Sequence, residues 1–188
     1  MRKKKQSAPA EAESRDLKRE IYDWVECVVT ALMFSVLLFV FVARIIGVVG
    51  GSMQPTLYGG YKVITSRLFY TPHQGDIVVL TKESFDDDAI VKRVIATEGQ
   101  TVDIDFETGA VRVDGILLEE NYISEPTRTA LDFTGPVTVP KGHIFVMGDN
   151  RNESTDSRDS RIGCVDTRCV IGRAFAILYP FDKLGALH

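Results

Sequence analysis

The sequence predicts a mainly β protein in which one N-terminal transmembrane helix precedes an antiparallel β-domain, built as a barrel or a sandwich. One long apolar run stands near the N-terminus, and short segments rich in Val and Ile recur between turn signals after it. No amphipathic helix of useful length interrupts those segments. At 188 residues, the chain accommodates one domain with appendages.

Residues 1–24 are predicted to form a solvated basic tail in the cytoplasm. The tail opens on Arg2-Lys3-Lys4-Lys5 and carries seven Lys and Arg residues before Trp24. Lys and Arg concentrate on the cytoplasmic side of membrane segments, and Trp is frequent at the membrane interface. The mixed-charge patch next to Trp24 is expected to extend a helix toward the membrane surface.

Residues 25–46 are predicted to form a single transmembrane helix. Residues 27–43 carry no charge and span roughly 26 Å at ~1.5 Å per residue, which snorkelling of Arg44 and a further turn bring near the thickness of a bilayer. A cleaved secretory signal is the alternative, but the run is long for one and no small-x-small site follows cleanly. We therefore expect an uncleaved anchor with the N-terminus in the cytoplasm and residues 47–188 on the extracytoplasmic side of the membrane.

Seven segments of the domain are predicted strands because Val and Ile recur in them between turn residues. They are Lys62–Thr65, Asp76–Leu80, Ala89–Ala96, Thr101–Phe106, Ala110–Val113, Ile144–Met147 and Val170–Leu178. Thr108-Gly109 and Asp114-Gly115 are predicted hairpin turns, and Phe85–Asp88 is a predicted acidic loop.

Charge and cysteine content exclude some classes of function. After Val49 the chain carries 14 Lys and Arg against 20 Asp and Glu, with no basic stripe, which argues against a nucleic-acid partner. Cys27, Cys164 and Cys169 form no CxxC pair, so a structural zinc site is not expected. Cys164 and Cys169 lie close together in the exported part, where a short-loop disulfide is one hypothesis and a reduced Cys169 in the core is the other.

Ser52 is the candidate nucleophile of the chain. Gly50 and Gly51 precede it and allow unusual backbone conformations, while Pro55 stiffens the chain after it. A flexible segment followed by a rigid one suits a presented hydroxyl group. A plain linker between a membrane segment and a domain is the alternative interpretation of these residues.

Lys92 is the candidate general base. Strand alternation places it on the same face as Ile90 and Val94, and burial of that face would lower the pKa of the lysine until it accepts a proton near neutral pH. Alternatively, Lys92 lies on an exposed edge strand and prevents aggregation. Arg93 points to the other face and needs a partner of its own.

A polar cluster covers residues 148–158, after the predicted strand that ends at Met147. Its side chains are short and polar except for Arg151 and Arg158, a composition that is also typical of a satisfied loop. A calcium loop is not expected, because Arg151 falls where an EF-hand needs a ligand.

Together these segments resemble the bacterial type I signal peptidases, membrane-bound Ser/Lys proteases. The matching motifs are Ser52-Met53-Gln54-Pro55-Thr56-Leu57, Gly75-Asp76-Ile77-Val78-Val79, Lys92-Arg93-Val94 with Gly99, and Gly148-Asp149-Asn150-Arg151 with Ser154, Asp156, Ser157 and Arg158. The resemblance implies that Ser52 is the nucleophile, Lys92 the general base and Ser154 the group that orients the lysine. Asp156 and Arg158 would be a supporting pair. Substrate-binding or motif positions would be Gly50, Gly51, Met53, Pro55, Asp149, Asn150 and Arg151.

Two departures from the family pattern bear on these roles. Ala96 and Gln100 stand where the family often has Gly and Asp, which is expected to alter the end of a strand. Gly50 stands where some members have a serine, so the oxyanion is expected to rely on backbone N–H groups, above all that of Ser52.

The resemblance implies an enzyme that removes signal peptides from exported preproteins after small-x-small motifs. Ser52 would form an acyl-enzyme, without a metal or another cofactor, and the substrate would bind as an extended peptide beside an exposed strand. The lipid bilayer is the second expected partner. Which preproteins are cut, whether sister enzymes share the work and whether the chain self-associates stay open.

Two rival interpretations remain. One is a triad of Ser52, His143 and Asp149, which is weak because a lone histidine is more often structural. The other is a catalytically idle, membrane-tethered assembly module. An intact Ser52 and Lys92 pair distinguishes the enzyme from that module, which has no reason to keep a lysine on an apolar face.

Overall fold

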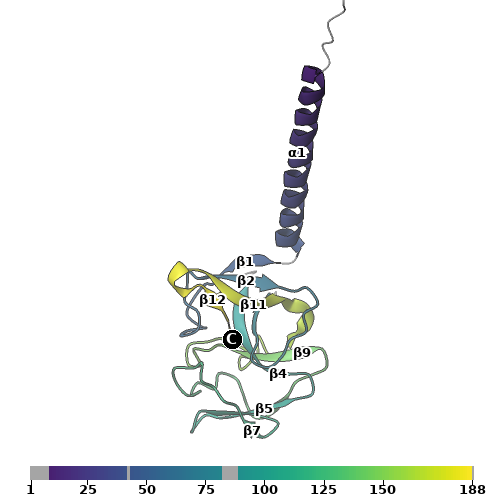
Figure 1. Ribbon diagram of the computed structural model, residues 1–188. Coiled ribbons are helices and arrows are strands. Elements are labelled where there is room, and N and C mark those ends of the chain that lie inside the picture. The colour runs from purple at the N-terminus through teal and green to yellow at the C-terminus, as the bar shows by residue number, and fades with distance from the viewer. Residues whose placement is uncertain (1–8, 42, 82–88, 188) are drawn as a thin grey trace, which may run out of the picture. The chain divides into compact units, whose positions relative to one another are not determined.

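The structure, a computed structural model, describes residues 9–41, 43–81 and 89–187. The basic cluster at residues 2–5 and the predicted acidic loop at residues 85–88 lie outside these ranges. The chain divides into two compact units, Met1–Val42 and Ala43–His188 (Figure 1).

The first unit contains one helix, α1 (Pro9–Phe41), which begins well inside the predicted tail. Proline is favoured at the first position of a helix, where its missing N–H has no partner to lose. The helix ends at Phe41, so the predicted transmembrane boundary at residue 46 is wrong. Strand β1 (Arg44–Gly47) follows instead, and its β-branched Ile45 and Ile46 pair with strand β2. Among the described residues, no helix is both long and apolar enough to cross a membrane.

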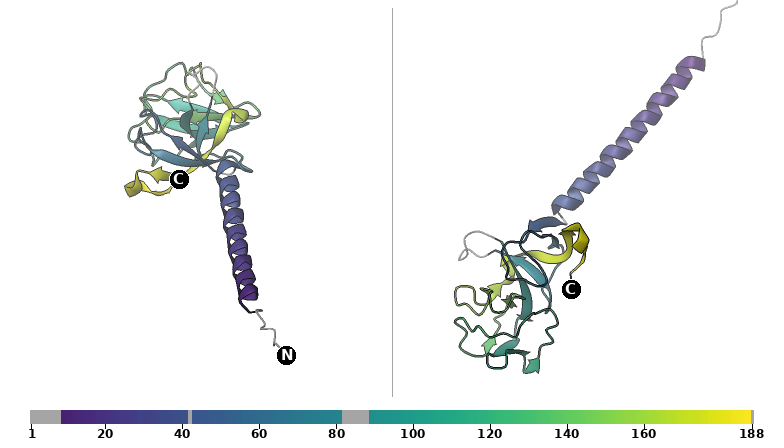
Figure 2. Two further views of the ribbon diagram at one scale, coloured as in Figure 1. Left: turned by 90° about the horizontal axis from the view of Figure 1, so that it is seen from above. Right: turned by 90° about the vertical axis from the view of Figure 1, so that its left-hand side faces the viewer.

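The larger sheet of the second unit has the strand order β1-β2-β11-β3-β4-β9-β10, with β12 paired to β11. Every described pair in it is antiparallel. Its further strands are β2 (Lys62–Ser66), β3 (Ile77–Leu80), β4 (Ile90–Thr97), β9 (His143–Met147), β10 (Val165–Asp166), β11 (Val170–Tyr179) and β12 (Gly185–Ala186). Figure 2 shows the yellow C-terminal segment turning back beside β11. Two 3-10 turns, η1 (Thr167–Cys169) and η2 (Phe181–Lys183), flank β11.

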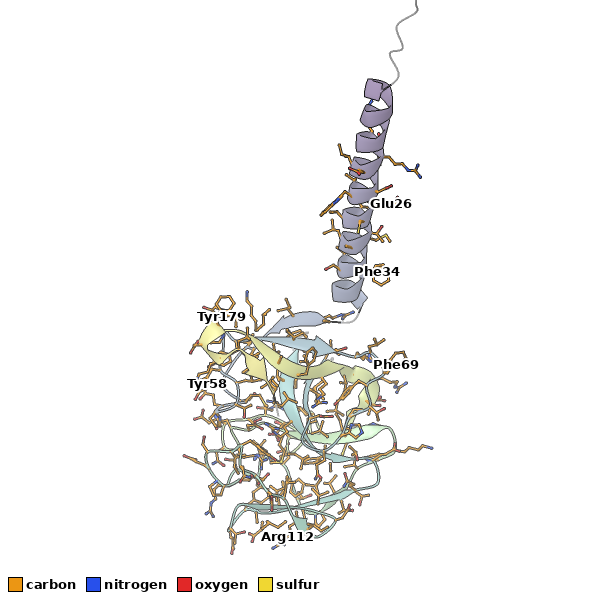
Figure 3. All side chains as sticks on the ribbon, in the orientation of Figure 1. Glu26, Phe34, Tyr58, Phe69, Arg112 and Tyr179 are labelled. Carbon is orange, nitrogen blue, oxygen red and sulfur yellow. The ribbon has the colours of Figure 1, made fainter. Side chains whose placement is uncertain are left out.

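The smaller sheet has the strand order β7-β6-β5-β8. Its strands are β5 (Thr101–Asp105), β6 (Ala110–Val113), β7 (Ile116–Leu117) and β8 (Val137–Thr138). Asp114 and Gly115, between β6 and β7, both have positive φ, as the predicted hairpin turn requires. The small sheet forms one end of the domain, where Figure 3 labels Arg112, and Tyr179 lies at the opposite end.

Two apolar clusters explain how the sheets are held. One cluster lies between the sheets and includes Ile95 of β4, Phe145 of β9 and Val102 of β5. The other contains Met53 and Leu57, from the segment that carries Ser52, together with apolar residues of β2, β3, β4 and β11. The second cluster therefore fixes the nucleophile segment against the larger sheet.

All seven predicted strands are confirmed, and the mainly β, antiparallel class with them. The prediction missed β1 and four strands of two residues each, because two residues are too few to produce a recognisable alternation. Within residues 43–81 and 89–187, the helical segments are two short 3-10 turns, which agrees with the lack of an amphipathic helical pattern there.

The hypothesis of a disulfide between Cys164 and Cys169 is wrong: neither residue is in a disulfide in this structure. Both side chains are partly buried, and each packs against a different apolar cluster. Packing into separate clusters keeps the two sulfur atoms in different environments despite their short separation in sequence.

Candidate active site

The nucleophile segment, residues 48–57, lies between β1 and β2. Gly50 has a φ of 79°, a left-handed conformation that favours glycine, and Ser52 follows it half-buried. Met53 is only 1% exposed and belongs to the apolar core, so it supports the segment from within. Pro55 is exposed. The segment thus presents a serine hydroxyl on a turn whose next residue is buried.

Lys92 lies in β4, an interior strand between β3 and β9, so the edge-strand alternative is wrong. Both faces of β4 are buried, and Lys92 itself is only 3% exposed. Its Nζ donates to Ser52 Oγ at 2.8 Å and to Ser154 Oγ at 3.1 Å. The structure therefore brings together the three residues expected to act as nucleophile, base and orienting group.

Burial lowers the pKa of Lys92 to about 8. The nearby Arg158 guanidinium lowers the pKa further, whereas the carboxylates of Asp156 and Asp149 oppose the shift. At a pKa of 8, roughly one Lys92 side chain in ten is neutral at pH 7, against fewer than about one in a thousand for an exposed lysine. A neutral amine next to a serine hydroxyl can accept its proton.

Asp149 is the partner that Arg93 needs. The guanidinium donates to both carboxylate oxygens at 2.8 Å, and the two side chains are 2% and 0% exposed. Thr56 of the nucleophile segment donates to the same carboxylate at 2.5 Å. Because Arg93 follows Lys92 directly in β4, Asp149 links the strand of the base to the segment of the nucleophile.

The loop after β9 also contacts the nucleophile segment directly. The Asn150 backbone N–H donates to Ser52 O at 3.0 Å, and its Nδ2 donates to Gly51 O at 3.2 Å. Gly148 packs so closely that a Cβ there would overlap both Ser52 O and Ser154 Oγ. Only glycine allows this approach without displacing the two serines.

Asp156 and Arg158 form the expected pair, and both are fully buried. The Arg158 Nε and one Nη donate to the two carboxylate oxygens at 2.9 Å, and the Gly148 N–H donates to the same carboxylate at 3.0 Å. Arg158 also donates to the carbonyl groups of Thr129 and Arg151 at 2.6 Å. The pair fixes the loop that carries Ser154.

Arg151 has partners that sequence reasoning missed. It forms an ion pair of 2.5 Å with Glu120 and donates to Thr127 Oγ1 at 3.0 Å. The ring of Tyr122 lies 3.9 Å from the Arg93 guanidinium and 5.8 Å from that of Arg151. Burial raises the pKa of Tyr122 to about 12, which keeps its hydroxyl protonated.

The alternative triad is not formed. His143 begins β9 and Asp149 follows the end of that strand, so the two are separated by more than about 13 Å of extended chain. The His143 Nδ1 instead lies 2.9 Å from the Lys141 carbonyl oxygen. The Asp149 carboxylate is occupied by Arg93 and Thr56.

The first departure from the family pattern, at Ala96 and Gln100, lies toward and beyond the end of β4, after Lys92. Ala96 is fully buried in β4, beside a register irregularity with β9. Gln100 Oε1 accepts from both the N–H and the hydroxyl of Thr97, so it stabilises the turn that follows β4. Across the described part of the chain, no group of three or more His, Cys, Asp or Glu side chains is placed to hold a metal ion.

Comparison with known proteins identifies the family of the chain. The family described as signal peptidase, peptidase S26, matches residues 21–179. The chain is 33% identical to signal peptidase I of Bacillus licheniformis, over 93% of this chain and 97% of that protein. It is 37% identical to a probable signal peptidase I-1 of Synechocystis, over 87% and 85%. A crystal structure of a signal peptidase I from Enterococcus faecalis V583 matches with a TM-score of 0.47 at 29% identity, and covers 55% of this chain and 97% of that one. The chain therefore belongs to the signal peptidase family, peptidase S26, as a type I signal peptidase and serine endopeptidase.

Proposed function

We propose that this signal peptidase cleaves through a dyad in which Ser52 is the nucleophile and Lys92 the general base. The observation that carries the proposal is the 2.8 Å contact between a buried lysine Nζ and a half-buried serine Oγ. The pKa of Lys92, lowered to about 8 by burial, supplies the neutral amine that the step needs. Ser154, at 3.1 Å, orients that amine.

The reaction follows from these roles. Neutral Lys92 takes the hydroxyl proton as Ser52 Oγ bonds to the carbonyl carbon of the scissile peptide. The C–N bond then breaks, and Lys92 returns the proton to the leaving amine. In the second half-reaction Lys92 takes a proton from water as the water oxygen bonds to the acyl carbon. The ester bond to Ser52 Oγ then breaks, and Lys92 returns the proton to that oxygen, which restores the serine hydroxyl and the neutral amine. The Ser52 backbone N–H stabilises the oxyanion in both steps.

The substrate is the signal sequence of an exported preprotein, cut after a small-x-small motif. We expect it to bind as an extended strand, since β1 is the terminal strand of the larger sheet and leads directly into the nucleophile segment. The uncharged run at residues 27–43 attaches the enzyme to the bacterial cytoplasmic membrane, and the basic residues before it keep the N-terminus inside. The domain then meets its substrates on the outer face.

An idle, membrane-tethered assembly module of the same fold is the alternative function. A module of that kind gains nothing from Lys92, because burying an amine without catalytic use only lowers stability. The intact contact between Ser52 and Lys92 therefore favours the enzyme.

Cleavage of a labelled preprotein by the full chain in detergent tests the proposal, with the new N-terminus identified by sequencing. Ser52→Ala, Lys92→Ala and Lys92→Arg should each abolish cleavage, because arginine keeps the charge but cannot act as a base at neutral pH. His143→Ala should retain most of the activity. An active Lys92→Arg enzyme would remove the general-base assignment, and no cleavage by the unchanged chain would favour the idle module.

A further inference from the structure

Asn150 holds two consecutive carbonyl groups of the nucleophile segment. Its side-chain Nδ2 donates to Gly51 O at 3.2 Å, and its backbone N–H donates to Ser52 O at 3.0 Å. The turn bond from the Gln54 N–H to Gly51 O, at 3.1 Å, adds a second donor to the first of these carbonyls. The orientation of the peptide unit between Gly51 and Ser52 is therefore set jointly by the turn and by Asn150 of the loop after β9.

Because the peptide bond is planar, a contact that fixes the Gly51 carbonyl also fixes the direction of the Ser52 N–H. The Gly51 carbonyl and the Ser52 N–H belong to one trans peptide unit, in which they point in opposite directions. A bond that fixes the carbonyl toward Asn150 therefore directs the Ser52 N–H away from the loop. A rotation of this unit would move the N–H by the same angle as the carbonyl.

The Ser52 N–H is available to a ligand. Among the residues that the structure describes, none accepts a hydrogen bond from it. Gly50, two residues before Ser52 and with a φ of 79°, supplies no side-chain hydroxyl as a second donor. The stabilisation of a developing oxyanion in this chain thus depends strongly on the direction of one backbone N–H.

We infer that Asn150 is a positioning residue, whose Nδ2 bond to Gly51 O aims the Ser52 N–H at the oxyanion of the tetrahedral intermediate. The inference rests on the proposed role of Ser52 as nucleophile. Asn150 acts through the backbone of Gly51 and Ser52 and does not itself touch the reacting atoms. Residue 150 needs a hydrogen-bond donor on its side chain. The carboxylate of Asn150→Asp has the same shape as the amide, but it would repel the Gly51 carbonyl.

The test compares Asn150→Asp and Asn150→Ala with the unchanged full chain in detergent. Loss of an oxyanion donor costs about 100- to 1,000-fold in kcat, and misdirection of one should cost somewhat less, about 10- to 100-fold. KM should stay within about twofold, since the ground-state peptide does not use the donor. The pH profile of Asn150→Ala should keep its apparent pKa, because the hydrogen bonds of Asn150 go to Gly51, Ser52 and Glu153 and not to Lys92 or Ser154.

A peptide aldehyde separates positioning from a structural role. Ser52 Oγ bonds to the aldehyde carbon, Lys92 takes the proton, and the carbonyl electron pair moves onto the oxygen that the Ser52 N–H would bind. The inhibition constant of the aldehyde should rise by the same factor by which kcat falls. That of the matching peptide product, which ends in a planar carboxylate, should change little.

Asn152→Ala is the matched control. Asn152 lies in the same loop, but its Oδ1 accepts from the Arg128 N–H at 2.9 Å, away from the nucleophile segment. Its removal should leave kcat nearly unchanged. Glu153→Gln, which alters the 3.5 Å bond that the same Asn150 Nδ2 donates to Glu153 Oε2, should also be active.

Three results would overturn the inference. The first is a kcat for Asn150→Asp within about twofold of that of the unchanged chain. The second is a higher KM with an unchanged kcat. The third is loss of folding in both variants while each folded molecule keeps its affinity for the aldehyde. The last result would give Asn150 a structural role. None of these results bears on the dyad of Ser52 and Lys92, which the activity of Lys92→Arg tests separately.

Discussion

Burial of Lys92 disfavours its charged form, and the same burial supplies the neutral amine that a general base needs. The folded protein loses the Lys92 proton near pH 8, whereas the unfolded chain keeps it until about pH 10.5. Between these values the unfolded state binds more protons, so the stability of the fold rises with pH across this window. Below pH 8 the full cost of burying the amine remains, on the order of 3 kcal/mol.

Replacement of Lys92 by the uncharged Met should remove that pH dependence. The difference in unfolding free energy between the original chain and Lys92→Met should shift by about 3 kcal/mol in favour of the original between pH 7 and pH 10.5. Denaturant titrations of both proteins at several pH values measure it. Lys141→Met, at an exposed lysine, is the control and should show no such shift. A constant difference for Lys92→Met would mean that its pKa is not lowered.

The sequence predicted that Arg93 needs a partner, but it did not reveal every residue that contacts Arg93 and Arg151. Asp149 was recognisable because it stands in a motif of its own. Glu120 and Tyr122 were not, because they contact Arg151 and Arg93 only through the folding of a loop that carries no local pattern. Contacts between residues so far apart in sequence depend on the tertiary fold.

At the scale of elements, the loop after β9 acts as the support of the nucleophile segment. It supplies Asp149 to Thr56 and Asn150 to two carbonyl groups, and Gly148 allows the two segments to touch. The bidentate pair between Arg93 and Asp149 ties this support to β4. Nucleophile and base are thus positioned by one connected set of elements.

Gly148→Ala should move the loop after β9 away from the nucleophile segment. A methyl group at residue 148 would overlap Ser52 O and Ser154 Oγ, so we expect activity to fall by at least about 100-fold. Overpacking should also cost about 1–3 kcal/mol of stability. Gly185→Ala adds the same methyl group to β12, where there is space, and should be active. Full activity in Gly148→Ala would show that the two segments are not in close contact.

Strand alternation could not reveal how β4 is buried. It correctly set Lys92 and Arg93 on opposite faces but left open which face was inside, whereas both are. An interior strand covered on both sides has no polar face for the pattern to detect. The end of α1 was also misplaced, because Ile45 and Ile46 continue an apolar run equally well as helix or as strand.

At the scale of the whole molecule, the proposed topology places residues 1–24 inside the cell and the β-domain outside. Protease added to intact cells should degrade the domain and spare the tail, which antibodies to tags at each end would detect. Permeabilised cells are the control, in which both parts should be cut. A tail that is cleaved in intact cells would invert the topology.

The proposed mechanism depends on a lysine that becomes neutral near physiological pH. The pH dependence of kcat/KM for the full chain, measured with a signal-peptide substrate, tests this most directly. We expect kcat/KM to rise with pH through an apparent pKa of about 8 and then to level off, as Lys92 loses its proton. A profile that rises only near pH 10.5, or through the ordinary pKa of histidine at about 6.5, would contradict the assignment of Lys92 as the base.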